Sequence, residues 1–168
     1  MKKNDNSLFI AYEKNLKQFR NSVVKAGVLM KDGNQKHDES SLTVFQIGMI
    51  HEFGVPEKNI PRRSFIRVPI ENAMKDLVNL IETNHKKVEE NSMSAKVALD
   101  RLGIQAQNII KQSFRKNDWK PNAPITIKGG WMRKNGKRFF IKGKKSTKPL
   151  IDKSQLIDSI SYIVEKEN

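Results

Sequence analysis

The pair His51-Glu52 is the chain's nearest approach to a metal site. In zinc metalloproteases this pair opens a helical motif whose second histidine follows three residues after the glutamate, and Val55 occupies that position here. The other histidines, His37 and His85, fall in separate predicted elements. We therefore expect His51 to be a packed or helix-capping residue, and we expect neither a metal nor a cofactor.

The other motifs that could carry chemistry lack the partners it requires. Asp32-Gly33-Asn34 is too short for a calcium loop and predicts a turn. The glycines of 129–130 and 143–146 do not complete a phosphate-binding loop between a strand and a helix. Ser159 and Ser161 have no histidine and acid to activate them. The sequence therefore predicts a protein that is not an enzyme.

The residues around His51 have the composition of a docking surface instead. Gly54 follows a predicted helix end, and a proline then fixes a corner beside two arginines and an aromatic residue. Arginine and aromatic residues are enriched in the cores of protein interfaces. We expect a subunit interface formed by Glu52, Phe53, Pro61, Arg62, Arg63 and Phe65.

Composition restricts the class of protein. The 168 residues suit one domain, 1–168, which should bury roughly 70% of the surface that its unfolded chain exposes. The net charge of +14 indicates an anionic partner or an acidic neighbouring surface. Because the chain has no cysteine, disulfides and thiolate metal sites are excluded. No apolar run approaches the roughly 20 residues needed to span a bilayer, so we expect no membrane partner.

The positive charge is concentrated in one segment. Residues 111–148 hold 13 Lys or Arg and a single acid, Asp118, which gives this segment +12 of the total +14. Both tryptophans, Trp119 and Trp131, also fall here. We interpret residues of about 115–148 as a basic arm on an otherwise ordinary domain.

Hydrophobic periodicity predicts an alternation of helices and strands. Pro69 can occupy the first turn of a long helix, and Ser92 or Ser94 can cap a second one, so together they indicate a helical hairpin. Asn135-Gly136 favours a tight type I′ hairpin. The predicted elements are a helix over 9–23, a strand over 23–30, a helix from Ser41 or Thr43 to His51, a strand over 63–68, helices over 69–88 and 94–114, a strand at 125–127, a hairpin of 131–134 with 137–141, a helical turn from Asp152 through Leu156 with a capping-box-like pair in Asp152 and Gln155, and a strand over 159–165.

This order predicts an α+β fold. We expect a small mixed or antiparallel sheet covered by two long helices, with a protruding basic β-hairpin.

Three segments of the chain follow one another in a recognisable order. The first is Gly27-Val28-Leu29, and the second is Ile50 to Gly54 followed by Ile60 to Phe65. The third combines 121–126 with a closing motif that contains Pro149, Leu150, Asp152, Gln155, Leu156 and Ser159. Together they resemble a family of tailed-bacteriophage virion morphogenesis proteins, the tail-completion or head-tail joining proteins of the neck, which reads His-Glu-Phe-Gly and then Ile-Pro-Ala-Arg-Pro-Phe at the second segment. Ser154 stands where relatives have glycine, so we expect a plain helical turn there instead of a positive φ.

The resemblance implies a structural protein of the virion, assembled in the host cytoplasm. It implies a homo-oligomeric ring, a hexamer, that completes the tail and joins it to the DNA-filled head. The implied partners are the adjacent head-completion or connector protein and the tail-terminator or tail-tube protein.

The basic arm has two possible roles in such a ring. It can dock on an acidic surface of the adjacent ring with Phe139 and Ile141 buried, or it can touch the packaged duplex DNA weakly and without sequence preference. We favour docking. The residues expected to make either contact are Lys128, Trp131, Arg133, Lys134, Lys137, Arg138, Phe139, Lys142, Lys144 and Lys145. A different class of function stays open beside the ring, namely a freestanding basic protein that binds nucleic acid.

Overall fold

The computed structural model describes residues 6–36, 41–150 and 154–167, and these form an α+β fold, as the sequence predicts. Two antiparallel two-stranded sheets accompany the helices. In chain order the elements are α1 (Asn6–Arg20), β1 (Ser22–Val28), α2 (Met30–Gly33), α3 (Val44–Phe53), the 3-10 turn η1 (Pro56–Lys58), α4 (Arg67–Asn72), α5 (Met74–Glu89), α6 (Ala95–Lys116), α7 (Pro124–Lys128), β2 (Gly129–Lys134), β3 (Lys137–Lys142), α8 (Gln155–Asp158) and β4 (Ile160–Lys166).

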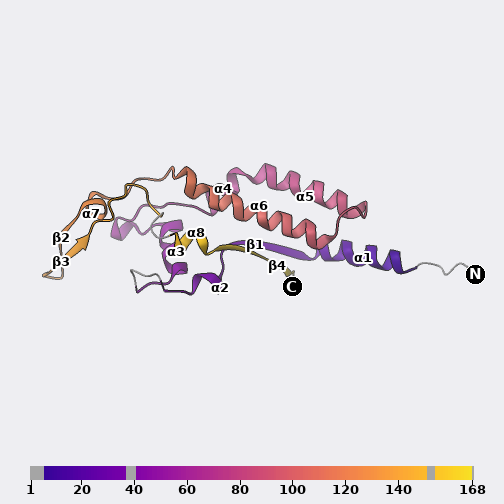
Figure 1. The fold of residues 1–168 in the computed structure, drawn as a ribbon, viewed down its shortest axis with the longest axis horizontal. Helices are drawn as coiled ribbons and strands as arrows, with labels where there is room; N and C mark the ends of the chain where they lie inside the picture. Colours follow the sequence, from indigo (N-terminus) through magenta and orange to yellow (C-terminus); the bar gives the residue numbers. More distant parts are fainter. Residues whose placement is uncertain (1–5, 37–40, 151–153, 168) are drawn as a thin grey trace, which may run out of the picture.

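The first and last strands form the sheet of the main body. β1 and β4 run antiparallel, with Ser22 opposite Lys166 and Val28 opposite Ile160. Helix α6 packs on both strands, and α5 packs in turn on α6 (Figure 1). The two long helices that the sequence predicts are therefore present, but they form two successive layers. Helix α6 lies on the sheet, and α5 lies on α6.

A glycine sets the distance between α6 and the sheet. At Gly103 a Cβ atom would overlap the ring of Tyr162 on β4. The helix begins at Ser94, whose side chain accepts a hydrogen bond from Val97 N, and it ends at Asn117 in the left-handed conformation. Of the two predicted caps, Ser94 is thus the correct one.

Helix α3 forms where the sequence predicts it. Thr43 is its N-cap, and a complete capping box links the Thr43 and Gln46 side chains to each other's backbone N–H groups. Gly54 ends the helix with φ 74°. A Cβ atom at Gly54 would lie 2.8 Å from Arg62 N, so glycine is required where the chain turns back on itself.

The strand predicted for residues 63–68 is wrong. The backbone of 61–64 is irregular, and α4 already begins at Arg67. Local β propensity is overridden because a buried carboxylate binds the backbone N–H groups at the start of this helix. Pro69 does lie in the first turn, as expected, but Ala73 divides the predicted long helix into α4 and α5.

The strand predicted at 125–127 is also wrong, because these residues form the helical turn α7. Pro124 is at the first helical position, where its fixed φ favours a helix. Gly129 then ends the turn with φ 74°. The short apolar alternation of three residues was not sufficient evidence for a strand.

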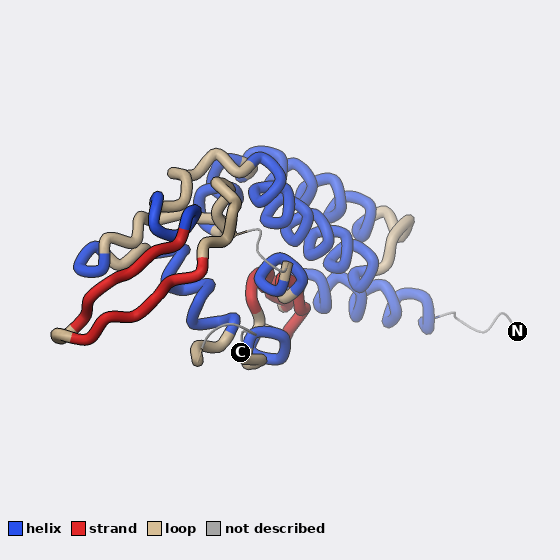
Figure 2. Tube along the Cα trace, turned by 60° about the vertical axis from the view of Figure 1, so that its left-hand side comes forward, coloured by secondary structure: helices blue, strands red, loops and turns tan. Residues whose placement is uncertain are grey.

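The basic hairpin is present and projects from the body (Figures 1 and 2). Strands β2 and β3 pair from Gly129–Lys142 to Lys134–Lys137. Asn135 and Gly136 have φ values of 51° and 76°, as a type I′ turn requires at both central positions.

The core of the body joins segments from most of the chain. Its buried residues are Val44, Phe65, Ile110, Phe114, Leu156 and Ile160. Phe114 makes edge-to-face contacts with Phe65 and with Trp119. The 63–65 segment and the C-terminal turn α8 therefore meet inside the same core.

Candidate functional site

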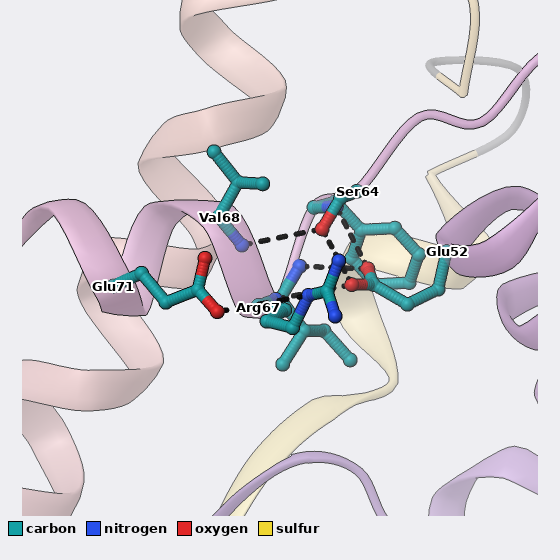
Figure 3. Close-up of polar contacts among 7 residues, drawn as sticks. Glu52, Ser64, Arg67, Val68 and Glu71 are labelled. Atoms are coloured by element: carbon teal, nitrogen blue, oxygen red, sulfur yellow. Dashed lines mark hydrogen bonds and ion pairs between the residues drawn. The ribbon is translucent and has the colours of Figure 1, made fainter.

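Glu52 lies at the centre of a buried hydrogen-bond network at the start of α4 (Figure 3). One carboxylate oxygen accepts from the Ser64 hydroxyl at 2.5 Å and from Arg67 N at 3.1 Å. The other accepts from Phe65 N at 2.8 Å and Ile66 N at 2.9 Å. The Ser64 hydroxyl in turn accepts from Val68 N. A negative charge at a helix N-terminus is stabilised by such donors and by the helix dipole.

This network gives Glu52 a role within the protomer. Glu52 is 7% exposed and Phe65 is fully buried, so neither side chain is on the surface where a subunit interface was predicted. Glu52 instead joins the end of α3 to the start of α4, and Phe65 fills the core beside Phe114. The same sequence features that suggested a docking surface thus hold the fold together.

Arg63 is also buried, with 5% exposure, and contacts both α3 and the start of the basic arm. Its backbone N–H donates to His51 O at 2.7 Å. Its guanidinium donates from Nε to Lys120 O at 3.3 Å and from Nη1 to His51 Nδ1 at 3.3 Å. The lone pair on Nδ1 is thereby used, which requires the neutral form of His51.

The environment favours this neutral histidine. Burial, followed by the positive charges of Arg63 and Lys144, lowers the pKa of His51 to about 4. Burial also lowers the pKa of Arg63 from its ordinary value. His51 is therefore an uncharged acceptor near neutral pH, in agreement with the packed role predicted for it.

Phe53, Pro61 and Arg62 are the members of the predicted interface that reach the surface. Phe53 is 61% exposed at the end of α3, Arg62 is exposed and Pro61 is half-buried. An exposed phenylalanine and an exposed arginine have the composition of an interface core. The predicted interface is thereby reduced to these three residues.

The hairpin presents aromatic and arginine side chains on one of its faces. Trp131 is directly opposite Phe140 in the strand register, and their rings make an edge-to-face contact at 5.5 Å between centroids. The guanidinium of Arg138 lies 5.1 Å from the centre of the Trp131 ring. Trp131 and Phe140 nevertheless remain 63% and 59% exposed. This face is ordered by its own contacts and is open to a partner.

The opposite face of the hairpin is apolar as well. Phe139 pairs with Met132 and is 40% exposed, and Ile141 on the same face is half-buried. The other predicted contact residues of the arm whose side chains are described are exposed, namely Lys128, Arg133, Lys137, Lys142, Lys144 and Lys145. Lys134 lies at the end of β2, and its side chain is outside the described part of the structure.

Comparison of the chain with protein-family models, with curated proteins and with solved structures finds no match.

The closing motif belongs to the same core as the segment around Phe65. Pro149 and Leu156 are buried, and Leu150 packs against the cluster. Asn117 donates to Pro149 O, while the Ser159 hydroxyl donates to Leu156 O at 2.7 Å. These contacts fix the motif within the protomer. Asp152 lies outside the described residues, and with it the capping pair predicted for Asp152 and Gln155.

The plain helical turn expected at Ser154 is wrong. Ser154 has φ 56° and ψ −4°, which is the left-handed conformation that glycine adopts most easily. Its carbonyl accepts from Asp158 N to close the turn α8. The backbone geometry expected of a glycine is therefore kept although the glycine is absent.

The described residues at these surfaces include exposed aromatic rings and cations suited to binding. Among them there is no group of three or more His, Asp or Glu side chains that could hold a metal ion. No helix in the ranges given above is both long enough and apolar enough to cross a bilayer. The polar networks around Glu52 and Arg63 stabilise backbone, and the hairpin offers exposed aromatic and cationic groups.

Proposed function

We propose that this protein is a structural component of a tailed-bacteriophage neck. In this proposal it forms a homo-oligomeric ring, a hexamer, that completes the tail and joins it to the DNA-filled head. It acts in the virion, after assembly in the host cytoplasm, and its adjacent partners are a connector or head-completion protein and a tail-terminator or tail-tube protein.

One structural observation supports this proposal above the others. The segments that carry the family resemblance lie about 90 residues apart in the sequence, yet they pack into one core, where Phe65 joins the cluster that contains Leu156 and Ile160. Arg63 also donates hydrogen bonds to the side chain and to the backbone carbonyl of His51, which belongs to the other half of the same motif. Motifs that match by chance have no reason to share contacts, so their convergence favours a common fold.

The exposed surfaces fit an assembly protein. Leu8, Phe9 and Ile10 on α1 are 57–66% exposed, and the hairpin exposes four large apolar side chains at the other end of the molecule (Figure 1). Contiguous exposed apolar groups mark contact sites. A ring needs two different patches on each subunit, because each copy meets the next one head to tail. We assign Phe53 and Arg62 to one of these two patches and the hairpin to the adjacent ring.

Native mass spectrometry of the full chain, alone and with the neighbouring neck proteins, tests the ring. The expected species is a closed oligomer of six copies. Phe53→Glu combined with Arg62→Glu should leave only monomers, because the first change places a charge in the proposed contact and the second reverses the charge that is there. Monomers of the unchanged protein, even with its neighbours present, would count against the proposal.

A matched hairpin variant separates the two contacts. Trp131→Ala combined with Phe140→Ala should keep the ring, since both side chains are largely exposed and their ring contact is with each other inside the hairpin. It should lose binding to the adjacent ring. In electron micrographs, particles without functional protein should show filled heads and separate tails; normal particles would contradict the assigned role.

A further inference from the structure

An open cleft with a volume of about 720 Å³ lies between the end of α3 and the base of the hairpin. His51 and Arg63 contribute to one wall. Lys120 and Asn122 come from the chain that enters the arm, and Lys144 and Lys148 come from the chain that leaves it. The cleft lies within a single protomer, so its properties do not depend on ring formation.

Arg63 in this cleft is a buried cation without an acidic partner. No ion pair joins it to an acid in the described part of the chain. Two of its nitrogens bond neutral acceptors, Lys120 O and His51 Nδ1, and Nη2 has no hydrogen-bond partner among the described residues. A buried charge is costly without a counter-charge. The guanidinium is therefore poised to receive an anion from the cleft.

The rest of the lining has the same sign of charge. Arg63, Lys120, Lys144 and Lys148 are cationic, and the described residues that line the cleft include no aspartate or glutamate. Burial is the main cause of the low pKa of His51, and the positive charges of Arg63 and Lys144 lower it further. A single carboxylate would offset only a fraction of this charge.

The two lysine-bearing segments are held in place before any ligand arrives. Arg63 Nε binds Lys120 O. The entering segment is joined to the leaving one, because Asn122 N donates to Thr147 O and Asn122 Nδ2 donates to Ser146 O at 3.3 Å and to Lys148 O at 3.2 Å. Within the leaving segment, Lys148 N donates to the Ser146 hydroxyl. Ordering the two segments in advance reduces the entropy lost on binding.

We propose that this cleft binds the phosphodiester backbone of a nucleic-acid strand. Arg63 contacts phosphate oxygens, and Lys120 and Lys148 neutralise neighbouring phosphates. Consecutive phosphates supply one negative charge per nucleotide and so match a cleft lined by several cations better than an isolated carboxylate does. Arg63 therefore binds nucleic acid in this proposal, whereas the sequence predicts that it contacts a neighbouring subunit.

Fluorescence anisotropy with the full chain tests the cleft, using a labelled DNA single strand of about 20 nucleotides and the matching duplex. Lys120→Gln combined with Lys148→Gln should weaken binding to both probes by about tenfold or more at moderate salt. It should also reduce the slope of log affinity against log salt by about 1.5, because two phosphate contacts are lost. Both lysines are exposed, so the variant should fold normally, which circular dichroism checks.

The charge-matched control is Lys17→Gln combined with Lys75→Gln, on α1 and α5 away from the cleft. It should change the affinity by less than about twofold if binding is local. Equal weakening by both pairs would overturn the proposal, because the binding would then follow net charge alone. A poly-glutamate peptide of equal charge that displaces DNA as well as unlabelled DNA does would also overturn it.

Arg63→Lys provides a second measurement that keeps the charge. Lysine cannot reproduce the guanidinium fork, so the affinity should fall several-fold while the salt slope stays almost unchanged. Because Arg63 also supports the fold, circular dichroism first checks that this variant folds like the unchanged protein. The combined change of Lys120 and Lys148 remains the main test. Failure of the ring proposal would appear as monomers in the mass spectrum and would leave these binding results unaffected.

Discussion

The Ser64 hydroxyl donates a 2.5 Å hydrogen bond to the Glu52 carboxylate, although twelve residues separate them. Ser64 precedes α4, and Glu52 lies in the last turn of α3. The same carboxylate binds three successive backbone N–H groups from Phe65 to Arg67. Helix α4 has no side-chain cap from its own N-cap residue, Ile66, so Glu52 supplies from a distance what a local cap normally supplies.

Glu52→Ala should destabilise the protein strongly. It leaves the Ser64 hydroxyl and three N–H groups in a buried place without an acceptor, and we expect a loss of about 3 kcal/mol or more in the free energy of unfolding. Urea denaturation measures this loss. The control is Glu71→Ala on the exposed side of α4, where the ion pair with Arg67 is 3.7 Å long and its removal should cost less than about 1 kcal/mol. Equal effects of the two changes would exclude the capping role.

His51 should make the stability depend on pH. Its pKa is about 4 in the folded protein against an ordinary 6.5, so below pH 6.5 the unfolded chain binds the proton first. Stability is therefore complete above about pH 6.5 and is lost as the pH falls towards 4. Between pH 7 and about pH 5.5 the loss should be about 1 kcal/mol.

His51→Asn isolates this effect, because an asparagine carbonyl can accept from Arg63 but does not titrate. Denaturant unfolding at the two pH values is compared for both proteins. The variant should lose the pH dependence of this interval. The same dependence in both proteins would place the titrating group elsewhere.

Local signals in the sequence were sufficient for several elements. Asn135-Gly136 specifies the hairpin turn by its backbone preference alone, and Thr43 with Gln46 specifies the start of α3. The start of α4 could not be predicted in this way, since its determinant, Glu52, is distant in sequence and acts through the fold. The sequence predicts a strand in place of the turn α7 because two isoleucines at alternate positions fit either structure.

The candidate surfaces were predicted in part. Exposed Trp131 and the lysines of the arm follow from composition, but the burial of Arg63 depends on His51 and on Lys120 O, which only the fold brings together. Neither Lys120 nor Lys148 is among the contact residues that the sequence predicts. Each precedes a proline, which favours an extended backbone, and this repeated Lys-Pro pair at the two ends of the arm was the available signal.

Gly103→Ala should destabilise the protein although alanine favours helices. The added methyl group overlaps the Tyr162 ring, and such overpacking costs about 1–3 kcal/mol. In a Tyr162→Ala background the obstacle is gone, so the same change should stabilise α6 by up to about 1 kcal/mol. Thermal unfolding of the four proteins measures this reversal of sign. A destabilising effect in both backgrounds would show that Tyr162 is not the obstacle.

Ser154→Gly should stabilise the C-terminal turn. A non-glycine residue in the left-handed conformation costs about 1–2 kcal/mol, while the extra freedom of glycine in the unfolded chain costs about 0.5–1 kcal/mol. The expected net gain is about 0.5–1 kcal/mol in urea denaturation. Ser154→Ala has the same steric requirement as serine and should be nearly neutral, and Ser154→Val should be destabilising because its branched Cβ is worse in this conformation. The order Gly, then Ser and Ala together, then Val is specific to a positive φ, whereas a plain helical turn would rank Ala above Gly.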